Sequence, residues 1–225
     1  MHGERQTRST PRLVLTAAHA GVVACVVWLL AGLPPGTAPA WSPLASGDAV
    51  RRGLLAVLAV VYLIRFSLTS LYLLRRAVDW QEVLIVAPWL AFLHGAVAWL
   101  GGTNPRPVSI VAVIGLVLFG AGTAMGPVAE WMRLRWKARP ANAGHLYTGG
   151  LFRLSMHPNY LGDVLLFAGY ALVTGRWVAL ALPVLVLLSF VFVHVPTLDA
   201  YLSSRYGAEF RVYANRTARL VPGVW

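Results

Sequence analysis

The feature of the sequence that most constrains the fold is a series of long apolar runs separated by short polar stretches. A transmembrane α-helix needs roughly 20 consecutive, mostly apolar residues. Hydrophobic residues make up 58% of the 225 residues and charged residues only 12%, whereas soluble domains average about a quarter charged. The candidate spans are residues 13–33, 53–74, 83–101, 108–131, 160–174 and 178–197.

These runs predict an all-α fold, a polytopic integral membrane helix bundle with about six transmembrane helices. The fifth run is short and needs flanking residues to cross a bilayer. Residues 101–107, which read GGTNPRP, end the third run. Gly175-Arg-Trp177 makes a tight turn between the last two runs. We therefore expect the fifth and sixth runs to form a helical hairpin.

The formal net charge of +11 does not indicate nucleic-acid binding, because the basic residues do not form one patch. If six helices alternate in direction, most basic residues fall on one side of the membrane. They are Arg5, Arg8, Arg12, Arg75, Arg76, Arg133, Arg135, Lys137, Arg139, Arg205, Arg211, Arg216 and Arg219. By the positive-inside rule, both termini and the loop 133–156 are predicted to be cytoplasmic.

The N-terminus also has some features of a signal peptide. Ala38-Pro39-Ala40 resembles a cleavage site and follows a basic start. However, the apolar run that begins at Leu13 is longer than the 7–15 residues of a typical signal core. We favour an uncleaved first transmembrane helix.

The sequence offers no familiar metal or nucleotide motif. The six histidines are scattered, with no close pair at helical spacing for a di-iron site, and His94 and His194 are expected to be core residues with a local hydrogen bond. Cys25 is the only cysteine, so no cysteine pair can hold zinc. The segment GAGTAMG at residues 120–126 lacks dinucleotide-binding spacing. Gly122 and Gly126 instead predict a close helix-packing face.

The segment GGLFRLSMHPNYLGD at residues 149–163 places polar groups at the edge of an apolar run, where they are costly and usually functional. Pro158 fits the first turn of a helix, and Asn159 and Asp163 then share one face. A helix N-terminus attracts anions such as phosphate, and Arg153 adds a second cationic group. The alternative is that Asp163 only pairs with a neighbouring arginine in the bundle.

The polar segment after the sixth run combines a helical pattern with further candidate ligands. The residues that recur at helical spacing are Leu202, Tyr206, Phe210 and Tyr213. This pattern predicts a C-terminal amphipathic helix that lies in the membrane interface or packs back on the bundle. Asp199 and Arg216 are candidate cofactor-binding residues.

Several motifs together resemble one family. Trp136-Lys-Ala-Arg-Pro-Ala-Asn142, Thr148-Gly-Gly-Leu-Phe-Arg153, His157-Pro-Asn-Tyr-Leu-Gly-Asp163 and Arg216-Thr-Ala-Arg-Leu-Val-Pro222 are similar to the C-terminal half of the steroid 5-alpha-reductase-like (DUF1295-type) membrane proteins. The same superfamily contains the sterol reductases and the isoprenylcysteine carboxyl methyltransferases. The family pattern usually has arginine before His-Pro, where this chain has Met156.

The resemblance implies an NADPH-dependent reductase of a double bond in a steroid-like or other lipid. It implies a C-terminal half, residues 130–225, that binds NADPH in a cavity open to the cytoplasm, and an N-terminal half, residues 1–129, that binds the lipid. The implied cofactor-binding residues are Glu130, Lys137, Arg153, His157, Asn159, Tyr160, Asp163, Asp199 and Arg216. The catalytic candidates, by residue type only, are Tyr62, Tyr72 and Glu82.

Two other functions stay open. The first is an S-adenosylmethionine-dependent methyltransferase that acts on a lipid or an isoprenylcysteine-type substrate. Methyltransferases of the superfamily tend to carry a Glu-Glu pair at the end of the last span, where this chain offers only Asp199. The second is a degenerate, non-enzymatic membrane protein, which the Met156 departure favours. In the enzyme interpretations the lipid enters from the bilayer; the oligomeric state is left open.

Overall fold

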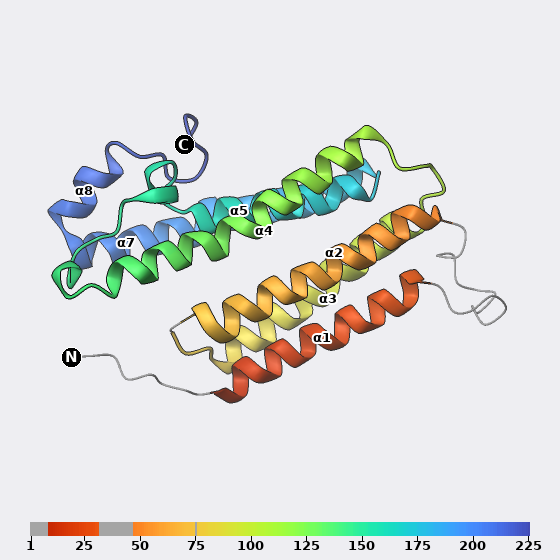
Figure 1. Ribbon diagram of the computed structural model, residues 1–225, viewed down its shortest axis with the longest axis horizontal. Helices are drawn as coiled ribbons and strands as arrows, with labels where there is room; N and C mark the ends of the chain where they lie inside the picture. The colour runs from red at the N-terminus through yellow and green to blue at the C-terminus, as the bar shows by residue number, and fades with distance from the viewer. Residues whose placement is uncertain (1–8, 32–46, 75) are drawn as a thin grey trace. The chain divides into compact units, whose positions relative to one another are not determined.

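The computed structural model describes residues 9–31, 47–74 and 76–225, and the regular elements in these ranges are helices (Figure 1). The α-helices are α1 Ser9–Ala31, α2 Ala49–Leu68, α3 Trp80–Gly102, α4 Ile110–Lys137, α5 Pro158–Val173, α6 Ala181–Ser189, α7 Val195–Tyr206 and α8 Ala208–Ala214. π-helical turns Thr69–Leu73 and Phe190–His194 continue α2 and join α6 to α7. Short 3-10 helices lie at Pro140–Asn142, Gly150–Arg153 and Trp177–Leu180.

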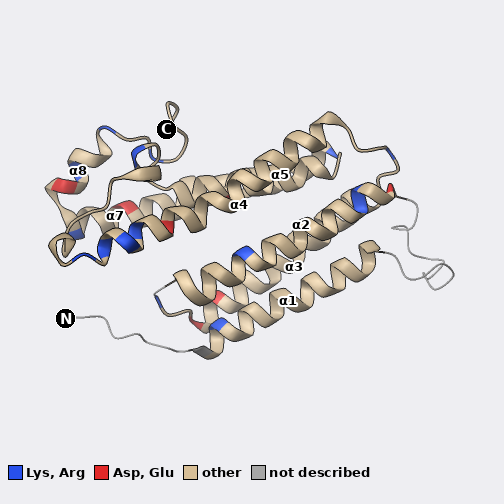
Figure 2. Cartoon of the chain, in the orientation of Figure 1, with Lys and Arg blue, Asp and Glu red and all other residues tan. Residues whose placement is uncertain are grey.

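The helices confirm the predicted helical membrane bundle. In the described ranges, the stretches long and apolar enough to cross a membrane are Thr10–Ala31, Ala49–Leu73, Trp80–Gly102, Ile110–Lys137 and Trp177–Tyr206. Helix α5 has 16 residues, fewer than a typical span, in line with the short fifth run. Figure 2 shows the long helices largely uncharged along their central stretches. The side of the membrane on which the loops and termini lie stays a prediction.

Local capping explains where several helices begin. The Asp48 carboxylate accepts a hydrogen bond from the Arg51 backbone N–H at the start of α2, at 2.8 Å. Asp79 does the same for the backbone N–H of Glu82 at the start of α3, at 2.7 Å. These aspartates satisfy amides that have no partner within the helix. Helix α5 begins at Pro158, as predicted.

The chain forms two compact units, and α4 and α5 contribute to both. Unit 1 contains the described residues up to Val117 together with Gly169–Leu180, and unit 2 contains Leu118–Ala168 and Ala181–Trp225. In unit 1, helices α1, α2 and α3 pack against one another (Figure 1). The expected division into substrate and cofactor halves at residue 130 concerns function and stays a prediction.

A buried arginine fixes the tight turn after α5 within unit 1. The Arg51 side chain is 2% exposed, and its guanidinium donates to the carbonyl oxygen of Val173 at 2.6 Å. The same group reaches the carbonyls of Arg106 and Pro107. Gly175 adopts φ 67°, which other residues rarely adopt. The predicted turn at this point is confirmed.

Close backbone packing between α4 and α5 confirms the predicted role of Gly122. A Cβ atom at this position would overlap the backbone of Gly162 and Leu166 on α5. Gly162 in turn faces the carbonyl oxygen of Gly122 and the backbone nitrogen of Gly126. Small residues let two backbones approach in this way. The glycines therefore set the distance between α4 and α5 in unit 2.

The predicted amphipathic segment packs back on its own unit. Phe210 and Tyr213 of α8 are buried against Met156, which precedes α5. Leu202 and Tyr206 of α7 pack against the same cluster. The segment forms two helices rather than one, because Gly207 takes φ 52° between α7 and α8. The packing alternative is confirmed.

The remaining expectations concern a proline-containing stretch, three arginines and two histidines. The stretch that contains Ala38-Pro39-Ala40 lies outside the described residues, as do Arg5, Arg8 and Arg75. His94 is completely buried and hydrogen-bonded, as predicted. The expectation of a core position for His194 is wrong, because its side chain is exposed. Its Nδ1 atom lies 3.1 Å from the carbonyl oxygen of Ser189.

Candidate functional site

Two segments that are far apart in the sequence pair directly in unit 2. The backbone N–H of Met156 donates to the carbonyl oxygen of Ala218 at 2.8 Å, and that of His157 donates to the carbonyl of Arg219 at 3.2 Å. The first segment leads into α5, and the second follows α8. This pairing brings the motif that ends in Asp163 beside the tail that begins at Arg216.

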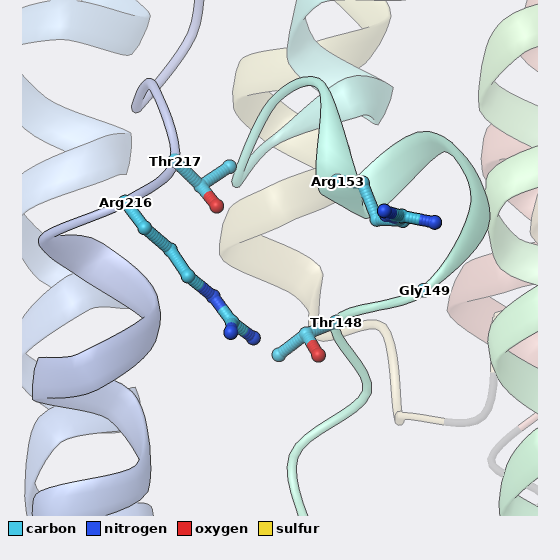
Figure 3. A pocket seen from close by; sticks show the side chains of 5 residues that line it. All are labelled: Thr148, Gly149, Arg153, Arg216 and Thr217. Atoms are coloured by element: carbon cyan, nitrogen blue, oxygen red, sulfur yellow. The ribbon is translucent and has the colours of Figure 1, made fainter.

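A cavity of about 500 Å³ opens between these two segments. Its lining residues are Thr148, Gly149, Arg153, Arg216 and Thr217 (Figure 3). Figure 3 shows the Arg216 side chain extending from the tail toward Thr148, while Arg153 extends from the short helix Gly150–Arg153. The structure thus brings the predicted residues Arg153 and Arg216 to one cavity.

The lining of this cavity suits an anion. Arg153 and Arg216 carry fixed positive charges, and their planar guanidinium groups match the geometry of phosphate and carboxylate oxygens. The hydroxyl groups of Thr148 and Thr217 can donate further hydrogen bonds. None of the lining residues is acidic. A ligand with several negative charges fits such a lining better than a cationic one.

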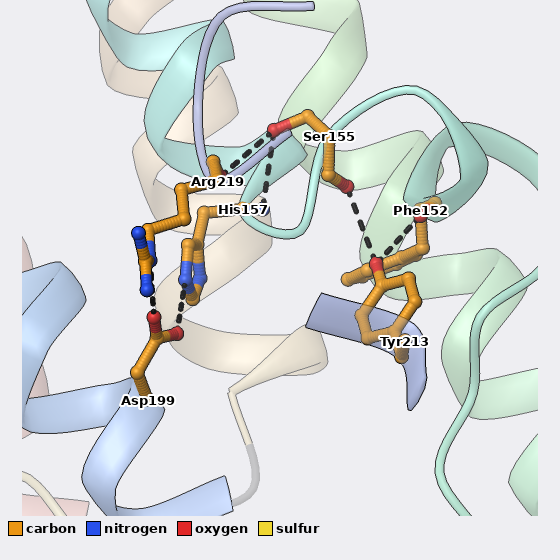
Figure 4. Close-up of polar contacts among 6 residues, drawn as sticks. All are labelled: Phe152, Ser155, His157, Asp199, Tyr213 and Arg219. Carbon is orange, nitrogen blue, oxygen red and sulfur yellow. Dashed lines mark hydrogen bonds and ion pairs between the residues drawn. The ribbon is translucent and has the colours of Figure 1, made fainter. Parts of the chain in front are cut away.

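Tyr213 holds the loop that carries Arg153. Its hydroxyl donates to the carbonyl oxygen of Phe152 at 2.6 Å (Figure 4), directly before Arg153. Burial raises the pKa of the Tyr213 phenol above its ordinary value, and Asp199 adds to this increase while Arg216 opposes it. The phenol therefore stays protonated over the physiological range and keeps its donor role.

His157 and Asp199 form a second polar cluster beside this loop. The His157 Nε2 atom lies 2.8 Å from one carboxylate oxygen of Asp199, and the other accepts a hydrogen bond from Arg219 Nε at 3.1 Å (Figure 4). The His157 side chain is 3% exposed. The hydroxyl of Ser155 accepts a hydrogen bond from the His157 backbone N–H. These contacts tie α7, the loop before α5 and the tail together.

Asn159 meets Glu130 at the start of α5. Its amide nitrogen donates to Glu130 Oε1, and Glu130 Oε2 accepts a hydrogen bond from Arg133. The amide oxygen of Asn159 is buried and has no hydrogen-bond partner in the described part of the chain. Glu130 therefore fixes the orientation of the Asn159 amide, and the amide oxygen is left as an acceptor.

The remaining candidates of the C-terminal half have separate surroundings. Tyr160 stacks on Phe190 with ring centroids 4.4 Å apart, and His157 lies on it at 5.5 Å. Lys137, at the end of α4, donates to the Tyr206 hydroxyl at 2.9 Å. Asp163 is half-buried on α5, one turn after Asn159. The roles implied for these residues stay predictions.

The three catalytic candidates of the N-terminal half lie in different environments. Tyr72 is 76% exposed. Glu82 forms a two-pronged ion pair with Arg76 at the start of α3, with distances of 2.6 and 2.7 Å. Tyr62 is buried, with its ring against those of His19 and His94. Only Tyr62 lies among other buried polar side chains, and the catalytic role of all three stays a prediction.

Sequence reasoning missed several residues of the site. Thr148 and Thr217 each adjoin a residue that the motifs highlight, and that adjacency is the signal that could have found them. Arg219 lies in the closing motif, yet no local pattern pairs it with Asp199, 20 residues earlier. Such a pair becomes visible only when the tail folds against α7.

Comparisons with known proteins place this site in a family. A family model described as "Protein of unknown function (DUF1295)" matches residues 84–217, more than half of the chain. A protein named "Probable O-methyltransferase ustE", from Ustilaginoidea virens, is 35% identical over 104 residues, which cover 45% of this chain and 37% of that protein. "Steroid 5-alpha-reductase DET2", from Solanum lycopersicum, is 38% identical over 68 residues, which cover 30% of this chain and 26% of that protein.

These matches span well under half of each curated relative. Both relatives carry the names of enzymes, one a methyltransferase and the other a reductase. Together with the apolar helices, they support an integral membrane protein. The chain belongs to the DUF1295 family and fits the steroid reductase-like superfamily.

Proposed function

We propose that this protein is a membrane-embedded, NADPH-dependent reductase of a double bond in a steroid-like or other lipid substrate. The observation that carries the proposal is the cavity lined by Arg153, Arg216 and two threonines, with no acidic residue in its lining. The cavity volume of about 500 Å³ is within the usual range for small-molecule sites. The likeness to a named steroid 5-alpha-reductase supports the same class of reaction.

The residues of the cavity fit the phosphate groups of NADPH. Arg153 and Arg216 would neutralise phosphate charge through guanidinium hydrogen bonds. The hydroxyls of Thr148 and Thr217 would bind remaining phosphate oxygens. NADPH has one more phosphate than NADH, so a cavity with two arginines should favour NADPH.

Asn159 fits a neutral donor on the same cofactor. A buried acceptor without a partner costs free energy unless a ligand satisfies it, and the carboxamide N–H of a nicotinamide is a suitable donor. Glu130 would hold the Asn159 amide in this orientation through the observed hydrogen bond. The chemistry that NADPH supplies when bound is hydride transfer to carbon.

The substrate is proposed to be a lipid that enters from the bilayer between the N-terminal helices. Several of these helices are long and apolar enough to span the membrane, so a lipid could reach them without crossing water. Reduction of an enone also requires a group that stabilises and protonates the developing enolate oxygen. The N-terminal helices would have to supply that group.

An O-methyltransferase that uses S-adenosylmethionine is the second candidate. The longer of the two alignments, which covers 45% of the chain, is with a protein of that name. S-adenosylmethionine carries a sulfonium cation and no phosphate, and the arginines of the cavity would repel that cation. The charge of the cavity therefore favours the reductase proposal.

Cofactor-dependent thermal stability in detergent tests the proposal. We expect NADPH to raise the melting temperature of the wild-type protein, because a ligand that binds only the folded state stabilises it. NADH should do so less, and S-adenosylmethionine should have no effect. Arg153→Ala and Arg216→Ala should each remove most of the NADPH effect. The matched control is Arg211→Ala, an exposed arginine on α8 outside the cavity lining, which should keep it.

The opposite outcomes are equally informative. Stabilisation by S-adenosylmethionine or by its demethylated product alone would refute the reductase proposal in favour of the methyltransferase. A wild-type protein that responds to none of these ligands would favour a degenerate, non-enzymatic protein. An NADPH effect of equal size in Arg153→Ala and Arg216→Ala would show that the cofactor binds elsewhere.

A further inference from the structure

A row of buried polar side chains runs through unit 1. His19 of α1 and His94 of α3 have no exposed surface, and Tyr170 of α5 is 1% exposed. The Nε2 atoms of His19 and His94 lie 3.0 Å apart. His94 Nδ1 lies 3.3 Å from the Tyr170 hydroxyl, which donates to the carbonyl oxygen of Leu55 on α2 at 3.4 Å.

Aromatic rings enclose this row. The rings of Phe66 and His19 form a T-shaped pair with centroids 4.8 Å apart. The Tyr62 ring centroid lies 5.2 Å from that of His19 and 5.6 Å from that of His94. His19, Tyr62 and His94 all lie within helices that are candidate membrane spans. Ionisable side chains inside a membrane are costly and usually functional.

The contact between Tyr170 and Leu55 favours one direction of the hydrogen bonds. The Leu55 carbonyl can only accept, so the Tyr170 hydroxyl donates to it and accepts from His94. A neutral imidazole has one donor nitrogen and one acceptor nitrogen, so His94 carries its proton on Nδ1 and accepts on Nε2. His19 must then donate from its own Nε2. Its Nδ1 is left as a lone-pair acceptor.

The His19 end of this row has a nitrogen atom that no group among the described residues binds. His19 Nδ1 is buried and has no hydrogen-bond partner in the described part of the chain. In this tautomer it can accept a proton from a hydroxyl group. If the protons of both imidazoles move to their other nitrogens, Tyr170 donates to His94, His94 donates to His19, and His19 Nδ1 becomes a donor for a carbonyl oxygen. The row can therefore exchange a proton with either kind of oxygen.

We propose that His19, His94 and Tyr170 form a proton relay, and that His19 Nδ1 is the end that exchanges a proton with the oxygen of the lipid substrate. The inference rests on the proposed reductase function and names the acid that this function requires. It also specifies the substrate class as a lipid whose only polar group near the relay is one carbonyl or hydroxyl oxygen.

The proton balance of this step is complete. The N–H bond at His19 Nδ1 breaks and an O–H bond forms on the enolate oxygen of the reduced enone. The Nε2 proton of His94 moves to His19 Nε2, and the hydroxyl proton of Tyr170 moves to His94 Nδ1. Tyr170 takes one proton from water, which must reach its buried hydroxyl, and both rings are then in the first tautomer. His19 is the catalytic residue of this scheme, and His94 and Tyr170 act through it.

The tautomers of the two histidines provide a test that needs neither cofactor nor activity. In ¹⁵N-histidine spectra of the protein in bilayers, we expect neutral rings, with the proton on Nε2 in His19 and on Nδ1 in His94. Tyr170→Phe removes the partner of His94 Nδ1, so the ¹⁵N signals of both rings should shift. His19 signals that do not change in Tyr170→Phe would overturn the relay.

Kinetics with a 4-en-3-oxo steroid as probe tests the role in turnover. His19→Phe should lower kcat by about 100-fold or more, in the range of general acid–base catalysis, while KM changes by less than about threefold. Phe66→Leu is the matched packing control, because Phe66 touches the same ring, and its kcat should stay within about threefold of wild type. A kcat for His19→Phe equal to that of the control would overturn the catalytic role.

The two proposals fail in different ways. The effect of NADPH on the melting temperature depends on Arg153 and Arg216, which belong to unit 2, so His19→Phe should keep it. If NADPH does not raise the melting temperature of the wild type, only the NADPH proposal is contradicted. The ¹⁵N-histidine spectra that test the relay are measured without a cofactor. Unchanged His19 signals in Tyr170→Phe, together with a normal NADPH effect, would contradict the relay alone.

Discussion

His157 Nε2 lies 2.8 Å from Asp199 Oδ1 and joins the loop before α5 to α7. The second oxygen of the same carboxylate is bound by Arg219 of the tail. Asp199 was expected to bind the cofactor, yet both of its oxygens have partners within the protein. Its carboxylate therefore holds together the segments that carry Arg153 and Arg216, and a direct contact with a cofactor stays a prediction.

The first prediction separates these two roles of Asp199. Asp199→Asn should lower the stability of the protein by about 1–3 kcal/mol, because a buried hydrogen-bonded group loses a partner. The carboxamide keeps one acceptor oxygen and replaces the other with a donor, so either the buried His157 or Arg219 then faces an N–H group. Thermal unfolding in detergent without any ligand measures this change.

Arg219→Gln is the matched variant on the other side of the carboxylate. The Arg219 side chain is 51% exposed, so the loss should be smaller, about 0–1 kcal/mol, as for exposed ion pairs. If Asp199→Asn leaves the melting temperature unchanged and weakens only NADPH binding, Asp199 contacts the cofactor directly and the supporting role is wrong.

The second prediction concerns the amide of Asn159. Asn159→Ala should weaken NADPH binding by about 1–3 kcal/mol, because a buried donor on the ligand would lose its acceptor. Glu130→Gln keeps an acceptor for the Asn159 amide nitrogen and should change NADPH affinity by less than about threefold. Equilibrium binding to each variant measures both effects. Equal losses in the two variants would mean that Glu130 itself contacts the cofactor.

The third prediction tests the close packing of α4 and α5. Gly122→Ala should destabilise the protein by about 1–3 kcal/mol, since the added methyl group would overlap backbone atoms and force the helices apart. Gly120→Ala is the matched control on the same helix, because a Cβ there has open space. It should be neutral or slightly stabilising, given the higher helix propensity of alanine. Similar melting temperatures for the two variants would argue against the packing role.

The fourth prediction concerns orientation in the membrane. In a Cys25→Ser background, a single cysteine at the exposed position 145 should resist impermeant thiol reagents in intact cells, and one at the exposed position 105 should react. The physical reason is the excess of basic residues around the 133–156 loop, which the positive-inside rule assigns to the cytoplasm. Labelling at 145 but not at 105 would reverse the orientation.

Much of the local structure could be predicted from the sequence. Apolar runs of spanning length predict the long helices, because a backbone in hydrocarbon must satisfy its own hydrogen bonds. Pro158 marks the start of α5, since its fixed φ and missing N–H suit the first turn. Gly122 and Gly126 predict a close approach of two helices because they lack side chains. These features depend on neighbouring residues or on residue type alone.

The candidate site could be predicted only in part. Arg153, Asn159 and Arg216 stand out because charged and amide groups are rare beside apolar runs. The hydrogen-bond partners of His94 and the supporting contacts of Asp199 could not be predicted, because they depend on groups brought close by folding. The expected core position of His194 failed for the same reason: which side of a helix faces its neighbours is set by packing.

The sequence by itself therefore determined a helical membrane protein with polar motifs at the edges of its apolar segments. Only the tertiary structure decided which polar groups meet. His19 and His94 are 75 residues apart, and His157 and Asp199 are 42 apart. Helical periodicity sets the face on which each side chain lies, but the rotation and axial position of packed helices decide which faces touch. That choice depends on close packing of the whole interface, which no local segment encodes.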